Sequence, residues 1–431
     1  MLNPLAVELN RTIQDTNPHV FEMLSEKGKR IYFPTKGILA QTAEANGKAI
    51  NATIGIALED SGSTMILSSI NEQVVLNGKD VFSYAPNYGK PELRSVWKKM
   101  LFKKNPALAQ AEISIPVVTS ALTHGLSAAG YLFIDEDDTI ITPDFYWENY
   151  SLVFDYAYGS KLRTFPMFND KRGFNTDELR RCLLDGPVGK KIVVLNFPNN
   201  PTGYTVTNEE ALITKDIIVE AAQKGNSVIV FVDDAYFGLV FEDGIFKESM
   251  FSLLADAHER ILAVKFDGAT KEDYVWGLRV GFVTFGCAKN SPGFYSALES
   301  KLGGSIRGSI SSASNLGQSV LLSVYGSPTY ESEKAEKFTI LQRRYEKIKE
   351  ILDNHPEYLQ TLNPLPFNSG YFMCLEVKNG KAEEIRRLLL DKYNTGVIAQ
   401  GSLLRVAFSS TPFNQIEKLF DNIYSASKEI D

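Results

Sequence analysis

The fold is decided by the stretch Lys191-Ile-Val-Val-Leu-Asn-Phe-Pro-Asn-Asn-Pro-Thr-Gly203, in which a short apolar run leads into a turn with two prolines and a glycine. Such a run is typical of a strand covered on both faces of a sheet. The prolines hold the turn in one conformation. A rigid turn at the carboxyl end of a strand can direct the amide of Asn200 to a ligand, because open α/β sheets bind ligands in the crevice at that edge. By itself, Pro-Thr-Gly is also common in plain turns.

Further apolar runs on both sides of this stretch predict more strands, which alternate with helical stretches. The predicted strands cover residues 113–119, 138–142, 191–197, 227–233, 260–266 and 278–285. This alternation predicts an α/β domain of three layers, with helices on both faces of a mostly parallel sheet.

A smaller α+β domain is predicted after the sheet. Residues 333–354 place apolar side chains at steps of three and four, which indicates one long amphipathic helix. A strand, a helix, a strand and a helix are then predicted at residues 370–377, 382–393, 403–408 and 414–430. We therefore divide the chain into a large domain of residues 56–325 and a small domain of residues 326–431. Residues 1–55 form an N-terminal segment that contributes to the small domain and the active site.

The composition argues against several classes of protein. The chain has 431 residues, 44% of them hydrophobic, and a net charge of −7 without long blocks of one sign, so binding to nucleic acid is not expected. No run of about 18 apolar residues could span a bilayer, and the N-terminus lacks the pattern of a signal peptide. The four histidines and three cysteines have no metal-site or disulfide spacing, so we expect a cytoplasmic protein without a metal.

Two other predicted strand ends carry reactive side chains. Val230-Phe-Val-Asp-Asp-Ala-Tyr236 ends an apolar strand with two carboxylates and a tyrosine. A buried carboxylate needs a partner, such as a protonated ring nitrogen, unless Asp233 only caps the next helix. Gly268-Ala-Thr-Lys271 precedes Arg279 by eight positions, counted from the lysine. A lysine near a cation in a water-poor cleft has a lowered pKa and can form a Schiff base, whereas a lone lysine is normally solvated.

The three segments, in this order, resemble the fold-type I pyridoxal 5′-phosphate (PLP) enzymes of the aspartate aminotransferase superfamily, from about residue 50 to residue 409. The resemblance implies that Lys271 forms the Schiff base with PLP and that Arg279 binds its phosphate. It also implies that Asp233 pairs with the ring nitrogen, and that Asn200 and Tyr236 bind the 3′-oxygen. Lys271, Asp233 and Tyr236 are the implied catalytic residues. Lys265 is a competing lysine, but the family's eight-residue step to the arginine disfavours it.

Further residues are implied to contact the cofactor. Val118-Thr-Ser-Ala-Leu122 would begin a helix whose N-terminal amides, at Ala121 and Leu122, bind the phosphate together with the hydroxyl of Ser120. Gly268 stands where many relatives carry a phosphate-binding serine, and Thr270 could supply that hydrogen bond instead. Tyr84 resembles the tyrosine that reaches the cofactor of the neighbouring subunit, which implies a homodimer.

An aromatic residue is implied to stack on the cofactor ring. Trp147 is the candidate, although its neighbours Phe145 and Tyr146 leave the register open, and an aromatic side chain here could also belong to the core.

Substrate-binding residues are implied by weaker matches. Gly55 resembles the glycine whose amide contacts the substrate carboxylate, and Asn200 is a second implied substrate contact. Arg405 stands where the family keeps the arginine for the α-carboxylate, a planar group that a guanidinium binds with two hydrogen bonds, although a solvated strand-end arginine is the alternative. The segment 306–311 resembles a loop that brings an arginine, here Arg307, to a side-chain carboxylate in the partner's site; otherwise Arg307 only braces the dimer.

The implied function is amino-group transfer from an L-amino acid, dicarboxylic or aromatic, to a 2-oxo acid such as 2-oxoglutarate. A PLP-dependent β-lyase or decarboxylase on the same scaffold is the alternative. A non-catalytic PLP-binding regulator is more remote, because no DNA-binding module precedes the predicted sheet.

Overall fold

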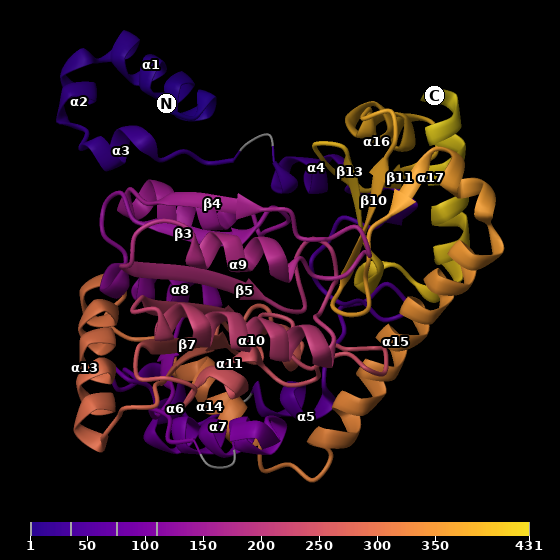
Figure 1. Cartoon of the computed structure of the whole chain (residues 1–431). Coiled ribbons are helices and arrows are strands. Elements are labelled where there is room, and N and C mark those ends of the chain that lie inside the picture. The colour runs from indigo at the N-terminus through magenta and orange to yellow at the C-terminus, as the bar shows by residue number, and fades with distance from the viewer. Residues whose placement is uncertain (1, 35–36, 75, 109–110, 431) are drawn as a thin grey trace.

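The computed structural model describes residues 2–34, 37–74, 76–108 and 111–430. Its largest sheet has seven strands in the order β2-β8-β7-β6-β5-β3-β4 (Figure 1). β8 is antiparallel to both of its neighbours, and the other pairs are parallel. The strands are β2 (Val117–Thr119), β3 (Thr139–Pro143), β4 (Lys161–Phe165), β5 (Lys190–Asn196), β6 (Ser227–Asp233), β7 (Ile261–Asp267) and β8 (Gly281–Gly286). The predicted α/β class with a mostly parallel sheet is confirmed.

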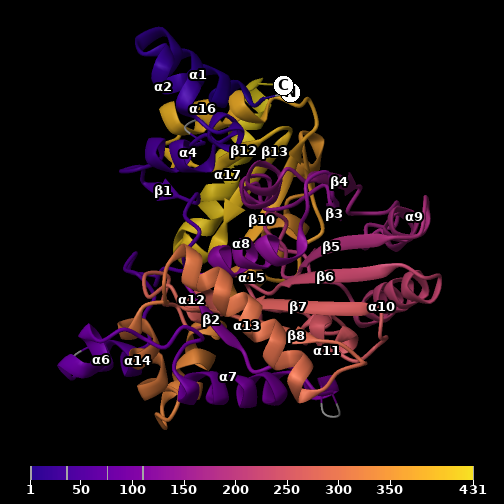
Figure 2. The ribbon, with the colours of Figure 1, turned by 90° about the vertical axis from the view of Figure 1, so that its left-hand side faces the viewer.

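Both faces of this sheet are covered by helices, which explains the continuous apolar runs. Along β5, Ile192 and Val194 belong to one core with helices α8 (Ala121–Phe133) and α13 (Pro292–Ser309). Val193 and Leu195 point the other way, into a core shared with α9 (Thr176–Leu184), α10 (Asn208–Gln223) and α11 (Met250–Leu254). Figure 2 shows α8 and α10 on opposite sides of the strands.

One strand of this sheet was not predicted, and two of its predicted strands are shorter than expected. In β4, which forms an edge of the sheet, only Phe165 is buried, so the strand lacks the apolar run that marks the others. β2 begins at Val117, and Ile113 makes only an isolated bridge with Gly286. β8 begins at Gly281 instead of residue 278, because Arg279 has a left-handed backbone with a φ of 54°.

A second sheet has four antiparallel strands in the order β12-β13-β10-β9. The long helix α15 (Tyr330–Asn354) leads to it, as the amphipathic pattern predicted. The strands are β9 (Leu362–Pro364), β10 (Phe372–Val377), β12 (Ile398–Gln400) and β13 (Leu403–Ala407), with helices α16 (Ala382–Asp391) and α17 (Ile416–Ile430). β9 and β12 were not predicted, because three residues are too few to show a period.

The start of the chain is attached to this second region. β1 (Ile50–Asn51) pairs in parallel with β11 (Thr395–Gly396). Before it lie α1 (Pro4–Thr16), α2 (Pro18–Met23), α3 (Glu26–Arg30) and α4 (Ile38–Glu44). Helices α1 to α3 bury only Ala6 and extend away from the sheets (Figure 1). The domain limits at residues 55 and 325 stay predictions.

The remaining elements connect these parts. They are α5 (Ser68–Asn71), α6 (Gly78–Phe82), α7 (Pro91–Lys104), α12 (Ala269–Glu272), α14 (Asn315–Val324), a π-helical turn η3 (Ser151–Tyr156) and the 3-10 turns η1 (Glu72–Val74), η2 (Pro106–Leu108), η4 (Pro356–Gln360), η5 (Phe408–Ser410) and η6 (Phe413–Gln415). Within the described ranges, no helix has the length and hydropathy needed to cross a membrane.

Candidate active site

The candidate site lies at the carboxyl ends of three neighbouring strands, β5, β6 and β7. β5 ends at Asn196 and β6 at Asp233, and these two residues face each other in the parallel register. β7 ends at Asp267 and is followed by the short helix α12, which contains Lys271. Because parallel neighbours end at the same edge of a sheet, the three motifs meet there.

Asp233 is a buried carboxylate with two hydrogen-bond donors. Its side chain is 3% exposed. The phenol of Tyr150 donates to its Oδ2 at 2.5 Å, and the backbone N–H of Ala235 donates to its Oδ1 at 3.1 Å. Burial raises the pKa of Asp233, whereas the hydrogen bond from Tyr150 and the charge of Lys271 lower it. The carboxylate therefore carries a large desolvation cost that a cationic partner would offset.

Tyr150 is the contact that the sequence analysis missed. It is fully buried and lies immediately before η3. The segment Trp147-Glu-Asn-Tyr150 drew attention to its tryptophan, but the tyrosine three positions later is the residue that reaches Asp233. The only available signal was a tyrosine three positions beyond Trp147.

The amine of Lys271 lies close enough to Asp233 for the carboxylate's charge to act on it. Nζ lies over the ring of Tyr236, 4.9 Å from the ring centroid. Burial, with a contribution from the charge of Arg279, lowers the pKa of Lys271 to about 8, although the charge of Asp233 raises it. Within the described parts of the chain, no carboxylate forms a salt bridge with this amine. A sizeable fraction of Lys271 is therefore the neutral amine near pH 8.

The competing Lys265 has a different environment. Its side chain is 0% exposed and pairs with Asp234 and, at 3.4 Å, with Asp267. Although burial lowers it, the charges of these carboxylates raise the pKa of Lys265. Lys265 is thus held as an ammonium inside the protein, whereas Lys271 is the lysine whose pKa is lowered.

Arg405 and Asn200 lie together on the other side of the site. Arg405 is 3% exposed; its Nη1 donates to Asn200 Oδ1 at 3.3 Å and its Nη2 to the carbonyl of Thr53 at 3.3 Å. Its Nε has no hydrogen-bond partner among the described residues, and the guanidinium lies 4.4 Å from the ring centroid of Phe372. Burial lowers the pKa of Arg405. A buried guanidinium that pairs with no carboxylate of the described chain is suited to bind one from a ligand.

The loops around Asn200 and Gly55 complete this side. The backbone N–H of Asn200 donates to Asn196 Oδ1 at 2.9 Å, which ties the loop to the end of β5, and the Asn200–Pro201 peptide bond is cis. Arg405 is hydrogen-bonded to Asn200, and its charge lowers the pKa of the buried phenol of Tyr236 against the effect of burial, so these three side chains lie close together. Gly55 follows Thr53, whose carbonyl contacts Arg405.

The predicted phosphate-binding backbone has unusual geometry. Ala121, the first residue of α8, has a φ of 61°, and Arg279 has a φ of 54°. Both are left-handed values that cost energy for residues with a side chain, and such strain is concentrated at functional sites. The two loops are in contact, because a Cβ on Gly281 would lie 2.7 Å from the carbonyl carbon of Ala121. Arg279 itself is exposed and donates to the carbonyl of Trp276 at 3.2 Å.

Gly268 and Thr270 explain a departure from the family pattern. A Cβ on Gly268 would lie 2.6 Å from the carbonyl oxygen of Val280 and 2.7 Å from Gly281 Cα, so a serine cannot fit there without a backbone shift. Two positions later, the hydroxyl of Thr270 is buried and has no partner among the described residues. A buried hydroxyl without a partner is costly unless a ligand satisfies it.

The aromatic residues near Asp233 narrow the choice of the stacking ring. Tyr146 lies parallel to Tyr150, at 6.4 Å and 11°, and Trp147 meets Tyr150 edge-on, at 5.7 Å and 85°. Phe145 instead packs against Phe168, 6.1 Å away, in a separate cluster. Trp147 and Tyr146 are therefore the two rings next to the site.

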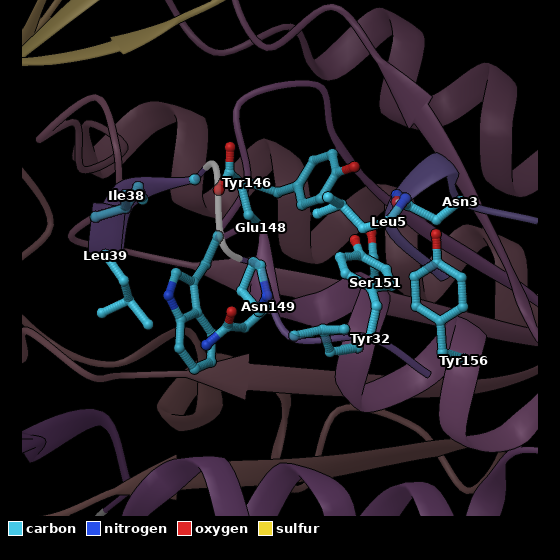
Figure 3. Close-up of a pocket in the computed structure, with 14 residues that line it drawn as sticks. Asn3, Leu5, Tyr32, Ile38, Leu39, Tyr146, Glu148, Asn149, Ser151 and Tyr156 are labelled. Carbon is cyan, nitrogen blue, oxygen red and sulfur yellow. The ribbon is translucent and has the colours of Figure 1, made fainter. Parts of the chain in front are cut away.

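A cavity of about 500 Å³ opens beside these rings (Figure 3). Tyr32 and Ile38 of the N-terminal segment line it, together with Tyr146 and Tyr156 of the segment after β3. Among the described residues that line it, Glu148 is the one charged side chain. Glu148 accepts a hydrogen bond from Gln400 Nε2 at 2.6 Å and is close enough for its charge to act on Arg405.

Tyr84 and Arg307 lie away from this pocket in the single chain. Tyr84 is 91% exposed and follows α6. Arg307 is in the last turn of α13 and donates to Ser311 Oγ at 3.1 Å. The expected loop at residues 306–311 is thus helical as far as Ser309. Both side chains are exposed on the surface of the single chain. Their predicted contacts with the partner's site stay predictions.

The comparisons with known proteins agree with this architecture. The family model "Aminotransferase class I and II" matches residues 48–423. A probable N-acetyl-LL-diaminopimelate aminotransferase of Bacillus subtilis is 26% identical over 206 residues, 48% of each chain. The aspartate aminotransferase of Pyrococcus abyssi is 27% identical over 203 residues, 46% of this chain and 48% of the relative. The matched segment thus spans about half the length of the curated relatives.

Solved structures show the same fold over nearly the whole chain. An aminotransferase from Anaerococcus prevotii superposes with a TM-score of 0.83 at 24% identity, over 94% of this chain and 98% of that one. An aromatic amino acid aminotransferase from Burkholderia cenocepacia gives a TM-score of 0.74 at 20% identity, over 95% and 100% of the two chains. The family match covers most of the residues, and the chain therefore belongs to the class I and II aminotransferases, a family of fold-type I enzymes that use pyridoxal 5′-phosphate.

Proposed function

We propose that the protein transfers the amino group of an L-amino acid to a 2-oxo acid, with PLP attached to Lys271. The observation that carries the proposal is the amine of Lys271, which has a pKa lowered to about 8 and lies over Tyr236 beside the buried Asp233. A reactive aldehyde requires a neutral amine, and the paired Lys265 offers none.

The side chains around the pocket fit PLP. Asp233 is a buried carboxylate suited to pair with the protonated ring nitrogen, and Tyr150 holds it in place. The hydroxyl of Thr270, which has no partner among the described residues, and the guanidinium of Arg279 would bind the phosphate together with the start of α8, where Ser120, Ala121 and Leu122 lie. When bound, PLP supplies the electron sink that makes the Cα–H bond of the amino acid labile.

Lys271 would have a second role as a free amine. Its Nζ would be the general base that takes the Cα proton of the amino acid and holds it for return. A base works best with a pKa near the working pH, and burial together with Arg279 brings Lys271 to about 8. Arg405 binds the α-carboxylate and orients the Cα–H bond, since its guanidinium is buried without a carboxylate partner in the described chain.

The cavity beside Trp147 favours an aromatic donor over a dicarboxylic one. Its described lining includes Tyr32, Tyr146 and Tyr156, which offer aromatic surface, and Glu148, which would repel a second carboxylate. Glu148→Gln removes the repulsion and keeps a side chain that can hydrogen-bond Gln400. We therefore expect kcat/KM for L-phenylalanine to exceed that for L-aspartate in the native enzyme, and the ratio to fall in Glu148→Gln. An unchanged ratio would remove Glu148 from the account of specificity.

A homodimer with shared active sites is part of the proposal. Tyr84 and its neighbour Phe82 are 91% and 87% exposed, which is unusual for large side chains on a surface that meets only water. A second copy that covers them would place Tyr84 near the partner's phosphate site.

The deciding experiment incubates the purified protein with amino acids and 2-oxoglutarate. Formation of glutamate supports amino transfer, whereas pyruvate and ammonia without an acceptor would indicate a β-lyase, and carbon dioxide a decarboxylase. Lys271→Ala should lower turnover by several orders of magnitude with little change in melting temperature, because it removes a reacting group that forms no salt bridge with the described residues. Normal turnover in Lys271→Ala would refute the assignment.

A further inference from the structure

Helix α15 contacts both halves of the site. It runs along one side of the molecule, from the large sheet to the second sheet (Figure 1). Its first turns bind the residues that follow Lys271. Its middle binds the segment that follows Arg405.

The first contact is a buried cluster of charges behind Lys271. Asp273 is 0% exposed and accepts hydrogen bonds from the phenol of Tyr330 at 2.5 Å and from that of Tyr325 at 2.8 Å. Lys334 pairs with Asp273 at 3.1 Å and with Glu272 at 3.0 Å. The two residues directly after Lys271 are therefore both bound to the start of α15.

The charges of the cluster favour the ionised form of its members. Although burial raises it, the charges of Lys104 and Lys334 lower the pKa of Glu272 to about 2. Although burial lowers it, the charges of Asp273 and Glu272 raise the pKa of Lys334. Removing one member would leave a buried charge without its partner.

The second contact is made by Arg344, which is 0% exposed. Its Nη1 donates to the carbonyl of Ser409 at 2.6 Å, and its Nη2 pairs with Asp60 at 2.7 Å. Ser409 lies four positions after Arg405, and its hydroxyl donates to the carbonyl of Ile56 at 3.0 Å, next to Gly55. Arg344 thus supports both segments that surround the α-carboxylate position.

We propose that α15 is a spacer that positions Lys271 and Arg405 relative to each other, with Lys334 and Arg344 as the positioning residues. These two residues are ten positions apart, a separation of about 15 Å along a helix axis. A continuous helix keeps its length when a contact at one end is lost. A substitution at one end should therefore leave the contacts at the other end in place. The proposal rests on the proposed function, because it assigns roles toward the PLP and carboxylate sites.

The test uses two variants with two binding measurements. Lys334→Met loosens the Lys271 end, and Arg344→Met loosens the Arg405 end. Arg343→Met is the matched control, because Arg343 is the exposed neighbour on the same helix, stacked on Phe413 at 4.9 Å. One measurement is the rate at which protein stripped of cofactor regains the visible absorbance of attached PLP. The other is the dissociation constant of the holoenzyme for 3-phenylpropionate or succinate, carboxylates without an amino group, whichever binds the native protein.

We expect each variant to affect one measurement and to leave the other nearly unchanged. Lys334→Met should slow PLP attachment by about tenfold or more and change carboxylate binding by less than about threefold, since displacement of a reacting group by an ångström costs up to two orders of magnitude. Arg344→Met should weaken carboxylate binding by about tenfold and leave the PLP rate near that of the native protein. Equal losses in both measurements, or values no different from Arg343→Met, would overturn the proposal.

Milder variants keep the test decisive if a buried substitution unfolds the protein. Tyr330→Phe removes one donor to Asp273, and Asp60→Asn weakens the ion pair of Arg344 at its half-exposed partner. Tyr330→Phe should slow PLP attachment less than Lys334→Met does, and Asp60→Asn should weaken carboxylate binding less than Arg344→Met does. The conservative variants Lys334→Arg and Arg344→Lys should also show smaller losses than the methionine variants. If the native protein attaches no PLP, the proposed function itself is wrong. If it attaches PLP but each variant affects both measurements equally, only the proposed role of α15 is wrong.

Discussion

At the scale of single residues, the hydrogen bond between Tyr150 and Asp233 controls the carboxylate that would pair with the cofactor ring. In the native protein, the hydrogen bond that Tyr150 donates at 2.5 Å lowers the pKa of Asp233. Tyr150→Phe removes this donor. The pKa of Asp233 should therefore rise in the variant, and activity should be lost at a higher pH on the acid side of the profile. We expect kcat to fall by about tenfold, in line with the loss of a hydrogen bond to a charged group.

The matched control for this prediction is Tyr158→Phe. Its phenol donates to the carbonyl of Ser127 at 2.7 Å, far along the chain from Asp233. A pH–rate profile of kcat should move for Tyr150→Phe and stay in place for Tyr158→Phe. Equal effects of the two substitutions would show that lost packing, and no property of Asp233, governs the result.

The two lysines of the β7–α12 segment should react differently with amine reagents. Lys271 has a pKa lowered to about 8, so it is protonated below that pH and neutral above it. In protein stripped of cofactor, labelling of Lys271 by acetic anhydride should rise as the pH increases through about 8 and level off above it. Lys265, whose pKa is raised by its paired carboxylates, should stay unlabelled over the same range and serves as the internal control. Peptide mass spectrometry measures both sites; equal labelling would contradict the assignment.

Several site residues could be predicted from the chain, and the reason is local. Asn200, Asp233 and Lys271 each follow a strand of the same sheet, so their convergence follows from parallel topology alone. Tyr150 could not be found in this way, because its contact with Asp233 spans 83 positions and depends on how η3 packs against the sheet. Tyr330, the buried partner of Asp273 on α15, is 57 positions away and could not be found from the sequence either.

At the scale of elements, the start of α12 packs closely against the start of β8, within the segment proposed to bind the phosphate. Gly268→Ser should destabilise the protein by about 1–3 kcal/mol, because its Cβ would meet Val280 O at 2.6 Å, and should weaken PLP binding through the displaced Arg279 loop. Gly277→Ser is the control in the same loop, since a Cβ there meets nothing within 4 Å. Thermal unfolding with and without PLP measures both effects; a neutral Gly268→Ser would contradict the steric account.

Strands could be predicted where both faces are buried, because such strands are continuous apolar runs in the sequence. β5, β6 and β7 are apolar runs whose alternate residues enter two different cores. β4 is half exposed at an edge, and β9 and β12 have three residues each, so neither composition nor period could indicate them. The left-handed Arg279 shortened β8, a feature of backbone geometry that side-chain hydropathy does not encode.

At the scale of the whole molecule, the proposed dimer makes a prediction about mixed subunits. Lys271→Ala inactivates its own site, and Tyr84→Ala would impair the partner's. A hybrid dimer of the two variants should therefore contain one intact site and recover about half of the native activity per dimer. If Tyr84 acted within its own chain, the hybrid would have no intact site. Coexpression with two affinity tags, followed by an activity assay of the purified hybrid, distinguishes the two outcomes.

The edges of the seven-stranded sheet bear on how two copies can meet. At one edge, β4 exposes Lys161 and Arg163, and charged side chains on an open strand discourage the ladder-like stacking that leads to aggregates. At the other edge, β2 is only three residues long and entirely buried. Neither border of this sheet therefore offers a long unpaired strand on which a continuous intermolecular sheet could grow.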